Sequence, residues 1–368
     1  MINAFDTDVL IVGGGPAGAS AALSILKFSD LNVTVVEQSD LNIQRIGEQV
    51  SSSIFDLLDY LGLDKSDFGD DCFLPGYSSN AAWGSSQITE RHSISSTHID
   101  SYQLNRSTFD LTLLAKASDM GAVIMPDTRC TEYQAQGEGW QVNINHETEG
   151  RFIVNARYLI DATGRQSHLA RHLEANITKD DELVAVGAFL EFQEEQDLAQ
   201  DFFLETVEDG WWYYAVLPEK KIVLSLFTDA DNAKKKQINK IENWTALLLD
   251  TVHVKHKVSG TVAFEKPWVK NAYSHFTDNT KIKNFIAIGD AACSFDPISS
   301  MGIGFAMSSA CNGALAIISQ DEDANSINNY NEGLKRIYDD YISTKSQYYK
   351  EEKRWPDAEF WRKRKAGG

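Results

Sequence analysis

The chain has 368 residues, 43% of them hydrophobic, and a formal net charge of −19. This hydrophobic content predicts an extensive core in one large domain or in two interleaved ones. The negative charge argues against a nucleic-acid partner and against an anionic membrane surface, because the phosphate groups of either would repel the protein.

The first residues contain no signal-peptide pattern, and no apolar run approaches the ~18 residues that span a bilayer. The four cysteines form no CxxC pair, and neither they nor the histidines have a metal-ligand spacing. Buried, reduced thiols are typical of such a pattern. We therefore expect a cytoplasmic monomer with no metal and no membrane association.

The N-terminal residues predict a βαβ unit. Residues 8–12 form a short, β-branched apolar run that is typical of a buried parallel strand. A helical pattern follows over 16–28, and residues 32–38 predict a second buried strand. The next helix is expected over 53–63, where it ends at a capping glycine.

Beyond residue 76 the predicted strands are mostly antiparallel. Residues 76–100 predict a β-hairpin, and a helix is expected over 106–120 with Ser107 as its N-cap. Three antiparallel strands are expected between 130 and 164, and an aromatic, strand-rich segment spans 182–228. The later expectations are helices at 232–250 and 301–318, a buried strand at 284–292, and a polar helical tail from 321.

Glycines in the first turn indicate a dinucleotide site. Gly13, Gly15 and Gly18 match GxGxxG, with Pro16 and Ala17 inside the motif. The first glycine permits a tight turn, the second lets backbone N–H groups approach a pyrophosphate, and the third lets the helix pack closely on the strand. The helix N-terminus would face the diphosphate. Glu37 ends the second strand and is followed by Gln38. A carboxylate at this place can accept a hydrogen bond from a ribose hydroxyl of the dinucleotide. The motif alone does not separate NAD from FAD.

Two later segments of the sequence indicate whether the cofactor is NAD or FAD. "YLIDATGRQSHLAR" (158–171) and "FIAIGDAACSFDPISSMGIGFA" (285–306) resemble the second and third fingerprints of FAD-dependent monooxygenases with the para-hydroxybenzoate hydroxylase fold. "RIGEQV" (45–50) and "QLNRSTFD" (103–110) are similar to further segments of that family. The resemblance implies that FAD is the cofactor. The cofactor-binding residues that it implies, beyond the first turn, are Arg45, Glu48, Arg106, Asp161, Gly164, Gly289, Asp290, Pro297, Gly302, Ile303 and Gly304.

In that family Asp290 would bind the ribityl and ribose region, the 297–304 segment would run along the isoalloxazine, and Arg106 would reach the diphosphate. The implied fold class is α/β: a Rossmann-type FAD-binding domain, of the glutathione-reductase and para-hydroxybenzoate hydroxylase type, interleaved with an antiparallel β-sheet substrate domain. The expected FAD-binding domain comprises 1–75, 102–178 and 280–345. The expected substrate domain comprises 76–101 and 179–279, and 346–368 form a C-terminal helix or tail. A solvated tail is favoured there over a docking segment.

A comparison with the halogenases of this fold indicates which branch of the family the sequence resembles. Thr163 precedes Gly164, which is similar to the halogenase and geranylgeranyl-reductase branches of the fold. Trp83 matches the tryptophan that follows the halogenase lysine, but Ser79 stands in the position of that lysine. No lysine lies between Ser66 and Arg106. The halogenase WxWxIP motif is also lost, because Tyr213 and Ala215 replace its tryptophans. A serine cannot orient hypohalous acid as an ammonium does, so halogenation is disfavoured.

The remaining resemblance is to the flavoprotein maturases of lysine and glycine oxidases that carry cysteine tryptophylquinone. It implies an FAD-dependent monooxygenase that oxygenates a tryptophan in the precursor of a quinoprotein amino-acid oxidase. Reduced flavin would react with O₂ to form a C4a-(hydro)peroxide, and NAD(P)H or another reductant would bind transiently. The alternatives are an FAD-dependent reductase or hydroxylase of a small aromatic or isoprenoid substrate, and a flavoprotein chaperone without turnover.

Six side chains are candidates for chemistry or substrate contact. Glu48 could act as an acid or base, although a structural hydrogen bond is an equal alternative. Trp83 is a second catalytic candidate. Trp211, Trp212, Tyr213 and Tyr214 are expected to line the substrate face, with a packed aromatic sheet as the alternative for each.

Overall fold

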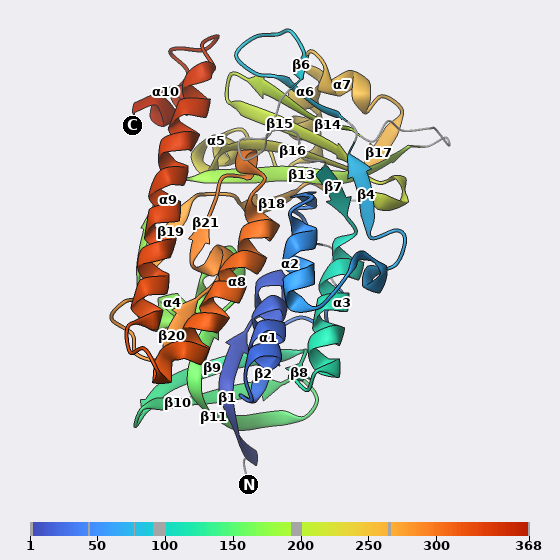
Figure 1. Cartoon of the computed structure of the whole chain (residues 1–368). Coiled ribbons are helices and arrows are strands. Elements are labelled where there is room, and N and C mark those ends of the chain that lie inside the picture. Colours follow the sequence, from blue (N-terminus) through green and yellow to red (C-terminus); the bar gives the residue numbers. More distant parts are fainter. Residues whose placement is uncertain are drawn as a thin grey trace.

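The computed structural model describes residues 3–42, 45–76, 78–90, 101–192, 201–263 and 266–366. Two large sheets lie at opposite ends of the molecule, and long helices run between them (Figure 1). The first sheet belongs to the nucleotide-binding part and the second to the predicted substrate part. The segments of the two parts alternate along the chain, as the sequence predicted.

The first sheet has seven strands in the order β8-β2-β1-β11-β10-β9, with β20 paired to β11. The strands β8, β2, β1, β11 and β20 are parallel, whereas β9 and β10 add antiparallel edges. Their bounds are β1 Asn3–Val12, β2 Val33–Val36, β8 Val123–Met125, β9 Thr128–Gln136, β10 Gly139–His146, β11 Gly150–Asp161 and β20 Phe285–Ala287. Four consecutive buried residues, Val9 to Val12, explain the apolar run in β1, because both faces of this strand are covered there.

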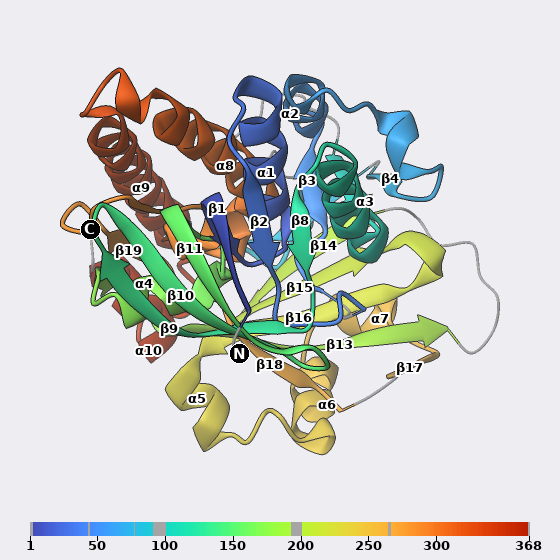
Figure 2. The same ribbon diagram turned by 90° about the horizontal axis from the view of Figure 1, so that it is seen from below.

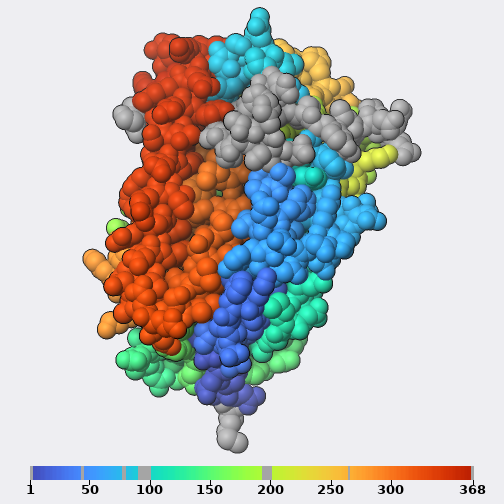
Figure 3. Space-filling model, viewed as in Figure 1, coloured from blue at the N-terminus to red at the C-terminus, as the bar shows by residue number. Residues whose placement is uncertain are grey.

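Helices from both ends of the chain cover this sheet. They are α1 (Pro16–Phe28), α2 (Ile54–Leu61), α3 (Arg106–Asp119), α8 (Gly302–Ile318) and α9 (Ser326–Glu351). Segments from the two chain ends lie side by side on the face that Figure 3 shows. The predicted N-cap, Ser107, is two residues too late: Asn105 is the N-cap, because its side chain accepts a hydrogen bond from the Thr108 N–H at 3.2 Å.

Helix α8 corrects one expectation. Residues 302–321 are long and apolar enough to cross a membrane by length and composition, although no such run was expected. Ten of the 17 residues of α8 are buried, and the helix packs against α1. Its apolar composition therefore matches a core helix of the nucleotide-binding part.

The second sheet has eight strands in the order β17-β13-β16-β15-β14-β5-β6, with β18 paired to β13. All pairs are antiparallel except β14 with β5. The bounds are β5 Ser78–Ala82, β6 Thr89–Glu90, β13 Leu183–Phe192, β14 Asp201–Val207, β15 Gly210–Val216, β16 Ile222–Asp229, β17 Thr261–Ala263 and β18 Trp268–Asn271. The expected hairpin is present as β5 and β6, and residues 91–100 lie outside the described part.

Short helices and two small sheets complete the fold. Figure 2 shows α5 (Ala230–Lys235) and α6 (Ile241–Leu249) outside the second sheet, and α7 (Val254–Lys257) follows them. The sheet β3-β7-β4 joins the two parts, and β12-β19-β21 lies beside α9. The remaining bounds are β3 Gln49–Ser51, β4 Phe73–Gly76, β7 Ser101–Leu104, α4 His168–His172, β12 Asn176–Lys179, β19 His275–Asp278, β21 Cys293–Ser294 and α10 Glu359–Ala366.

The C-terminal segment packs on the second sheet, which contradicts the expectation of a solvated tail. Trp361 of α10 is fully buried and donates its indole N–H to the Val207 carbonyl at 3.0 Å. Arg364 is also buried and forms a 2.7 Å ion pair with Asp229 at the end of β16. Aromatic and charged anchors therefore hold a segment whose position at the end of the chain had suggested exposure.

Candidate cofactor and substrate site

The turn after β1 excludes side chains at two of its glycines. Gly13 has a φ of +114°, and a Cβ atom there would lie 2.3 Å from the Ala162 carbonyl oxygen. A Cβ on Gly18 would lie 1.9 Å from the carbonyl oxygen of Gly13. These approaches bring the ends of β1 and β11 together beneath the start of α1. Pro16 begins that helix, directly after Gly15, where its missing N–H costs nothing.

Glu37 supports this turn from the end of β2. Its carboxylate accepts the Gly14 N–H at 2.7 Å and the Ser39 N–H at 3.0 Å. Gln38, the next residue, is exposed. The predicted contact of Glu37 with a ribose hydroxyl stays a prediction, and the structure adds a role in fixing the turn.

The two later fingerprints meet the turn from the other side. Gly289 approaches so closely that a Cβ there would lie 2.9 Å from the Cβ of Ala17. Asp290 follows; its Oδ1 is buried and has no hydrogen-bond partner in the described part of the chain, while Oδ2 lies 3.4 Å from Arg165. An orphaned carboxylate oxygen beside a phosphate-binding turn fits the hydroxyl-rich ribityl chain of FAD.

Asp161 holds the second fingerprint together by hydrogen bonds within the chain, and its predicted contact with FAD stays a prediction. Its Oδ1 accepts the Thr163 N–H at 2.9 Å, and its Oδ2 accepts the Ala170 N–H at 2.7 Å. The residue is fully buried, so its acceptors serve its own chain. Burial raises the pKa of the carboxyl group, and the hydrogen bonds from Thr163 oppose that rise. Asp161 therefore shapes the second fingerprint, and neighbouring Gly164 adopts a φ of +70° in the same turn.

The start of α8 is open. A Cβ on Gly302 or Gly304 would meet no heavy atom within 4 Å, and Ile303 between them is buried. Upstream, Pro297 begins a single helical turn whose N-cap, Asp296, accepts the Ile298 N–H at 3.0 Å. Free backbone N–H groups at an open helix start suit the carbonyl edge of an isoalloxazine. The residues that the chain brings together therefore fit FAD.

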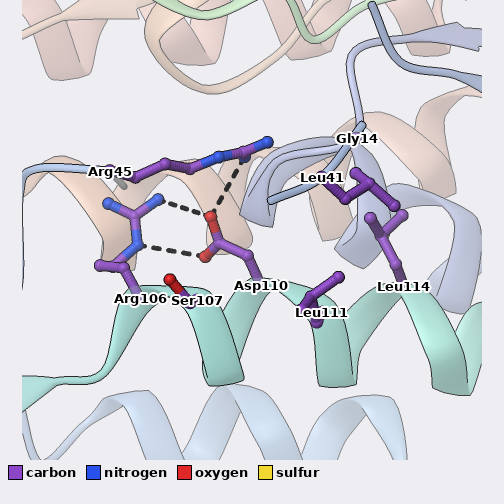
Figure 4. Close-up of a pocket in the computed structure, with 8 residues that line it drawn as sticks. All are labelled: Gly14, Leu41, Arg45, Arg106, Ser107, Asp110, Leu111 and Leu114. Carbon is purple, nitrogen blue, oxygen red and sulfur yellow. Dashed lines mark hydrogen bonds and ion pairs between the residues drawn. The ribbon is translucent and has the colours of Figure 1, made fainter. Parts of the chain in front are cut away.

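Two arginines share one carboxylate near the turn (Figure 4). Arg106 binds Asp110 through two nitrogens, at 2.9 and 3.1 Å, and donates to the carbonyls of Ile46 and Gly47. Arg45 reaches the same carboxylate at 3.1 Å, and its Nη1 lies 3.3 Å from where a Cβ of Gly15 would be. Arg45 thus lies over the phosphate-binding turn, whereas Arg106 holds the 45–50 loop. The predicted reach of Arg106 to a diphosphate stays a prediction, and Asp110 was not foreseen.

Glu48 is a buried carboxyl in that loop. It is 4% exposed, and its Oε1 has no hydrogen-bond partner among the residues that the structure describes. Burial raises its pKa to about 7, although the positive charge of Arg106 opposes the shift. A carboxyl group with a pKa near neutrality can exchange a proton at physiological pH, which suits an acid or base. Gln103 of β7, missed in the sequence, is 3% exposed, and its side chain lies beside the Tyr213 hydroxyl.

The four residues predicted to line the substrate face lie on opposite faces of β15, because side chains alternate along a strand. Trp212 and Tyr214 pack in the core under α6, where Trp212 meets Trp244 edge-on at 5.3 Å between ring centroids. Trp211 and Tyr213 point to the opposite face. Successive side chains of a strand alternate between faces, so the four cannot line one surface. Tyr213 alone is partly exposed, and burial followed by the charge of Glu48 raises its pKa.

Trp83 lies in an aromatic cluster on the flavin-domain side of the second sheet. Its ring contacts those of Trp211, Tyr349 and Trp361 at centroid distances of 6.3, 5.8 and 5.6 Å. Its indole N–H donates to the Tyr348 carbonyl at 3.2 Å. These contacts give Trp83 a packing role between the sheet and α9 and α10, and its predicted catalytic role stays a prediction.

These features define an FAD-dependent oxidoreductase with the para-hydroxybenzoate hydroxylase and halogenase fold, as the sequence predicted. Residues 6–333 match the model of the FAD-binding domain family, and the chain belongs to that family. It is also 41% identical over 360 residues to LodB of Marinomonas mediterranea, described as an FAD-dependent oxidoreductase. That match covers 98% of this chain and 97% of LodB.

Two solved structures show how the fold is shared. The flavin-dependent halogenase CmlS matches 98% of this chain, over 68% of its own length, with a TM-score of 0.86 and 25% identity. QhpG, a peptidyl tryptophan dihydroxylase essential for tryptophylquinone cofactor biogenesis, matches 98% of this chain and 79% of its own. Its TM-score is 0.76 at 20% identity, which shows a common fold alone.

Proposed function

We propose that this protein is a monooxygenase that oxygenates a tryptophan side chain of a partner protein, during the biogenesis of a cysteine tryptophylquinone cofactor. The observation that carries the proposal is Ser79. It lies in β5 of the substrate sheet, paired with Phe202, and the sequence resemblance matches it to the lysine of halogenases. The fold that CmlS uses for halogenation and QhpG for peptidyl tryptophan hydroxylation is thus present here without the ammonium group.

FAD, when bound and reduced, supplies the activation of O₂. One oxygen atom would enter the indole and the other would leave as water, with two electrons from NAD(P)H or another reductant. The chain supplies the rest. Glu48 can hold or accept a proton beside the cofactor, and the apolar residues around Tyr213 exclude water. The partner would be the precursor of a quinoprotein amino-acid oxidase.

Co-expression with such a precursor tests the proposal. We expect the precursor to gain the mass of one or more oxygen atoms on a tryptophan-containing peptide, and to lose that gain with Glu48→Gln. The surface variant Lys363→Ala is the matched control and should behave as the wild type. An unmodified precursor beside a flavoprotein that does consume O₂ would contradict the proposal. NADPH oxidation stimulated by a small aromatic or isoprenoid compound would then favour the small-molecule alternative.

A further inference from the structure

One face of α9 carries three buried polar side chains at intervals of four residues. Tyr341 and Lys345 are each 6% exposed, and Tyr349 is fully buried. Side chains four residues apart lie on the same face of a helix. The helix runs beside α8 and β19 (Figure 1). A lysine is almost never buried unless it is paired, so the partners of Lys345 show what this face of α9 contacts.

The Lys345 ammonium group has three acceptors. Its Nζ donates to the carboxylates of Asp180 and Asp181, the latter at 2.7 Å, and to the hydroxyl of Ser274 at 3.1 Å. The ammonium has three N–H groups, so each of them has a partner. The two carboxylates offset the buried positive charge, while Ser274, which precedes β19, continues the hydrogen bonds away from the ion pair.

These hydrogen bonds lead to the backbone of Asp296. The hydroxyl oxygens of Ser274 and Tyr341 lie 2.7 Å apart, and the Tyr341 oxygen accepts the Asp296 N–H at 2.7 Å. The Asp296 carboxylate accepts the Tyr349 hydroxyl at 2.6 Å and also caps the helical turn that begins at Pro297. Each link has one donor and one acceptor. Helix α9 therefore holds Asp296 both by its backbone and by its side chain.

The far end of the same turn is also fixed. Ser300 closes the turn with a φ of +51°, and its N–H donates to the Pro297 carbonyl at 3.1 Å. Its hydroxyl donates to the side-chain oxygen of Gln49 at 3.1 Å. A residue other than glycine is strained in this left-handed region and persists there when its surroundings hold it. The turn from 296 to 300 is thus held at both ends.

This turn leads directly into α8. The Phe305 N–H donates to the Met301 carbonyl at 2.8 Å, so the N–H groups of residues 302–304 precede the first hydrogen bond within the helix. A Cβ on Gly302 would meet no heavy atom within 4 Å, which leaves this end of the helix open. The position of the turn therefore sets where these N–H groups lie relative to the carbonyl edge of the isoalloxazine.

We propose that Tyr341, Ser274 and Lys345 are positioning residues for the flavin. By holding Asp296, they fix the turn that carries the N–H groups at the start of α8. Hydrogen bonds at the carbonyl edge stabilise reduced flavin, on which negative charge gathers, more than they stabilise oxidised flavin. The three residues therefore raise the reduction potential of bound FAD through the turn. This inference concerns the cofactor and does not depend on the proposed substrate.

The reduction potential of bound FAD, measured against a reference dye, tests the proposal. In Tyr341→Phe the Asp296 N–H loses its acceptor, and we expect the ratio of the affinities for reduced and oxidised FAD to fall about tenfold. For a two-electron couple this is a potential about 30 mV lower. Tyr338→Phe is the matched control, because Tyr338 lies one turn earlier on α9 and its buried hydroxyl has no partner among the described residues. It should leave the potential unchanged.

A second variant separates positioning from folding. Ser274→Ala breaks the link between Lys345 and Tyr341 but leaves the lysine paired with both aspartates. We expect a shift in the same direction, of about threefold in the affinity ratio. If Tyr341→Phe does not fold, this variant decides alone.

Two results would overturn the proposal. The first is an unchanged potential in the folded variants beside a lowered free energy of unfolding, which would restrict these residues to packing. The second is an equal shift in Tyr338→Phe, which would assign the effect to a general loosening of α9. The measurement needs no partner protein, so an unmodified precursor would reject the proposed function and leave this inference intact.

Discussion

The nucleotide-binding turn and the substrate sheet are built from different kinds of contact. In the turn, backbone meets backbone: Gly13 approaches Ala162, and Gly18 approaches Gly13, so closely that neither glycine can carry a side chain. In the sheet, side chains meet side chains, as where Trp211 stacks on Phe227 with ring centroids 4.0 Å apart. The close backbone contacts of the turn allow almost no other residue at the two glycines. The side chains of the sheet can be replaced while its strands keep their arrangement, and one fold can therefore host different chemistries.

The largest effect that this comparison predicts is in the sheet. Arg364→Ala would leave Asp229 buried, and among the described residues the remaining ion-pair partner would be Lys363, 3.7 Å away. Removing one partner of a buried ion pair costs about 3–5 kcal/mol. We expect the free energy of unfolding, measured in urea, to fall by about that amount. Lys363→Ala removes a half-exposed charge and should change it by less than about 0.5 kcal/mol. Equal effects of the two substitutions would mean that α10 is not anchored by this pair.

The next effect concerns catalysis at the junction. If Glu48 acts as a base, activity should rise with pH through about 7, and Glu48→Gln should lower the rate about 100-fold and remove the inflection. Stability should change in the opposite direction. The folded protein binds a proton that the unfolded chain releases between pH ~4.5 and ~7, so the free energy of unfolding falls as pH rises across that window. Urea unfolding at several pH values checks this, and a slope that Glu48→Gln leaves unchanged would assign it to another group.

The third prediction concerns a glycine substitution in the nucleotide-binding turn, where an added side chain would collide with the backbone. Gly18→Ala would place a Cβ 1.9 Å from a carbonyl oxygen that cannot move without disturbing β1. We expect a loss of about 2 kcal/mol in unfolding free energy together with lost FAD, measured from flavin absorbance after purification. Gly333→Ala in α9 is the control, because a Cβ there meets nothing within 4 Å. It should retain FAD and be slightly stabilising. Retention of full FAD by Gly18→Ala would show that the turn tolerates a side chain.

These two regions also differ in what sequence reasoning could find. The GxGxxG turn and the βαβ unit were predictable because glycine spacing and apolar runs reflect local geometry. The aromatic strand β15 was predictable as a strand, but the four adjacent residues were assigned to one surface although a strand must divide them. Gln103 and Asp110 were missed, because a single glutamine or aspartate has no pattern. Their importance depends on strands and helices that meet only in the folded chain. The burial of α10 was missed for the same reason, since Asp229 lies 135 residues before its partner.

The smallest predicted effect compares two tyrosines, one in each region. Tyr349 of α9 donates its hydroxyl to Asp296 at 2.6 Å and accepts the Trp211 indole N–H at 3.2 Å. Tyr60 of α2 has a buried hydroxyl without a partner. Tyr349→Phe should therefore cost about 1–2 kcal/mol, whereas Tyr60→Phe removes an unpaired buried hydroxyl and should leave the free energy of unfolding unchanged or raise it. Asp296 directly precedes the segment expected along the isoalloxazine, so Tyr349→Phe should also shift the flavin absorbance bands, which Tyr60→Phe should not. An unshifted spectrum with the full stability loss would restrict Tyr349 to packing the sheet against α9.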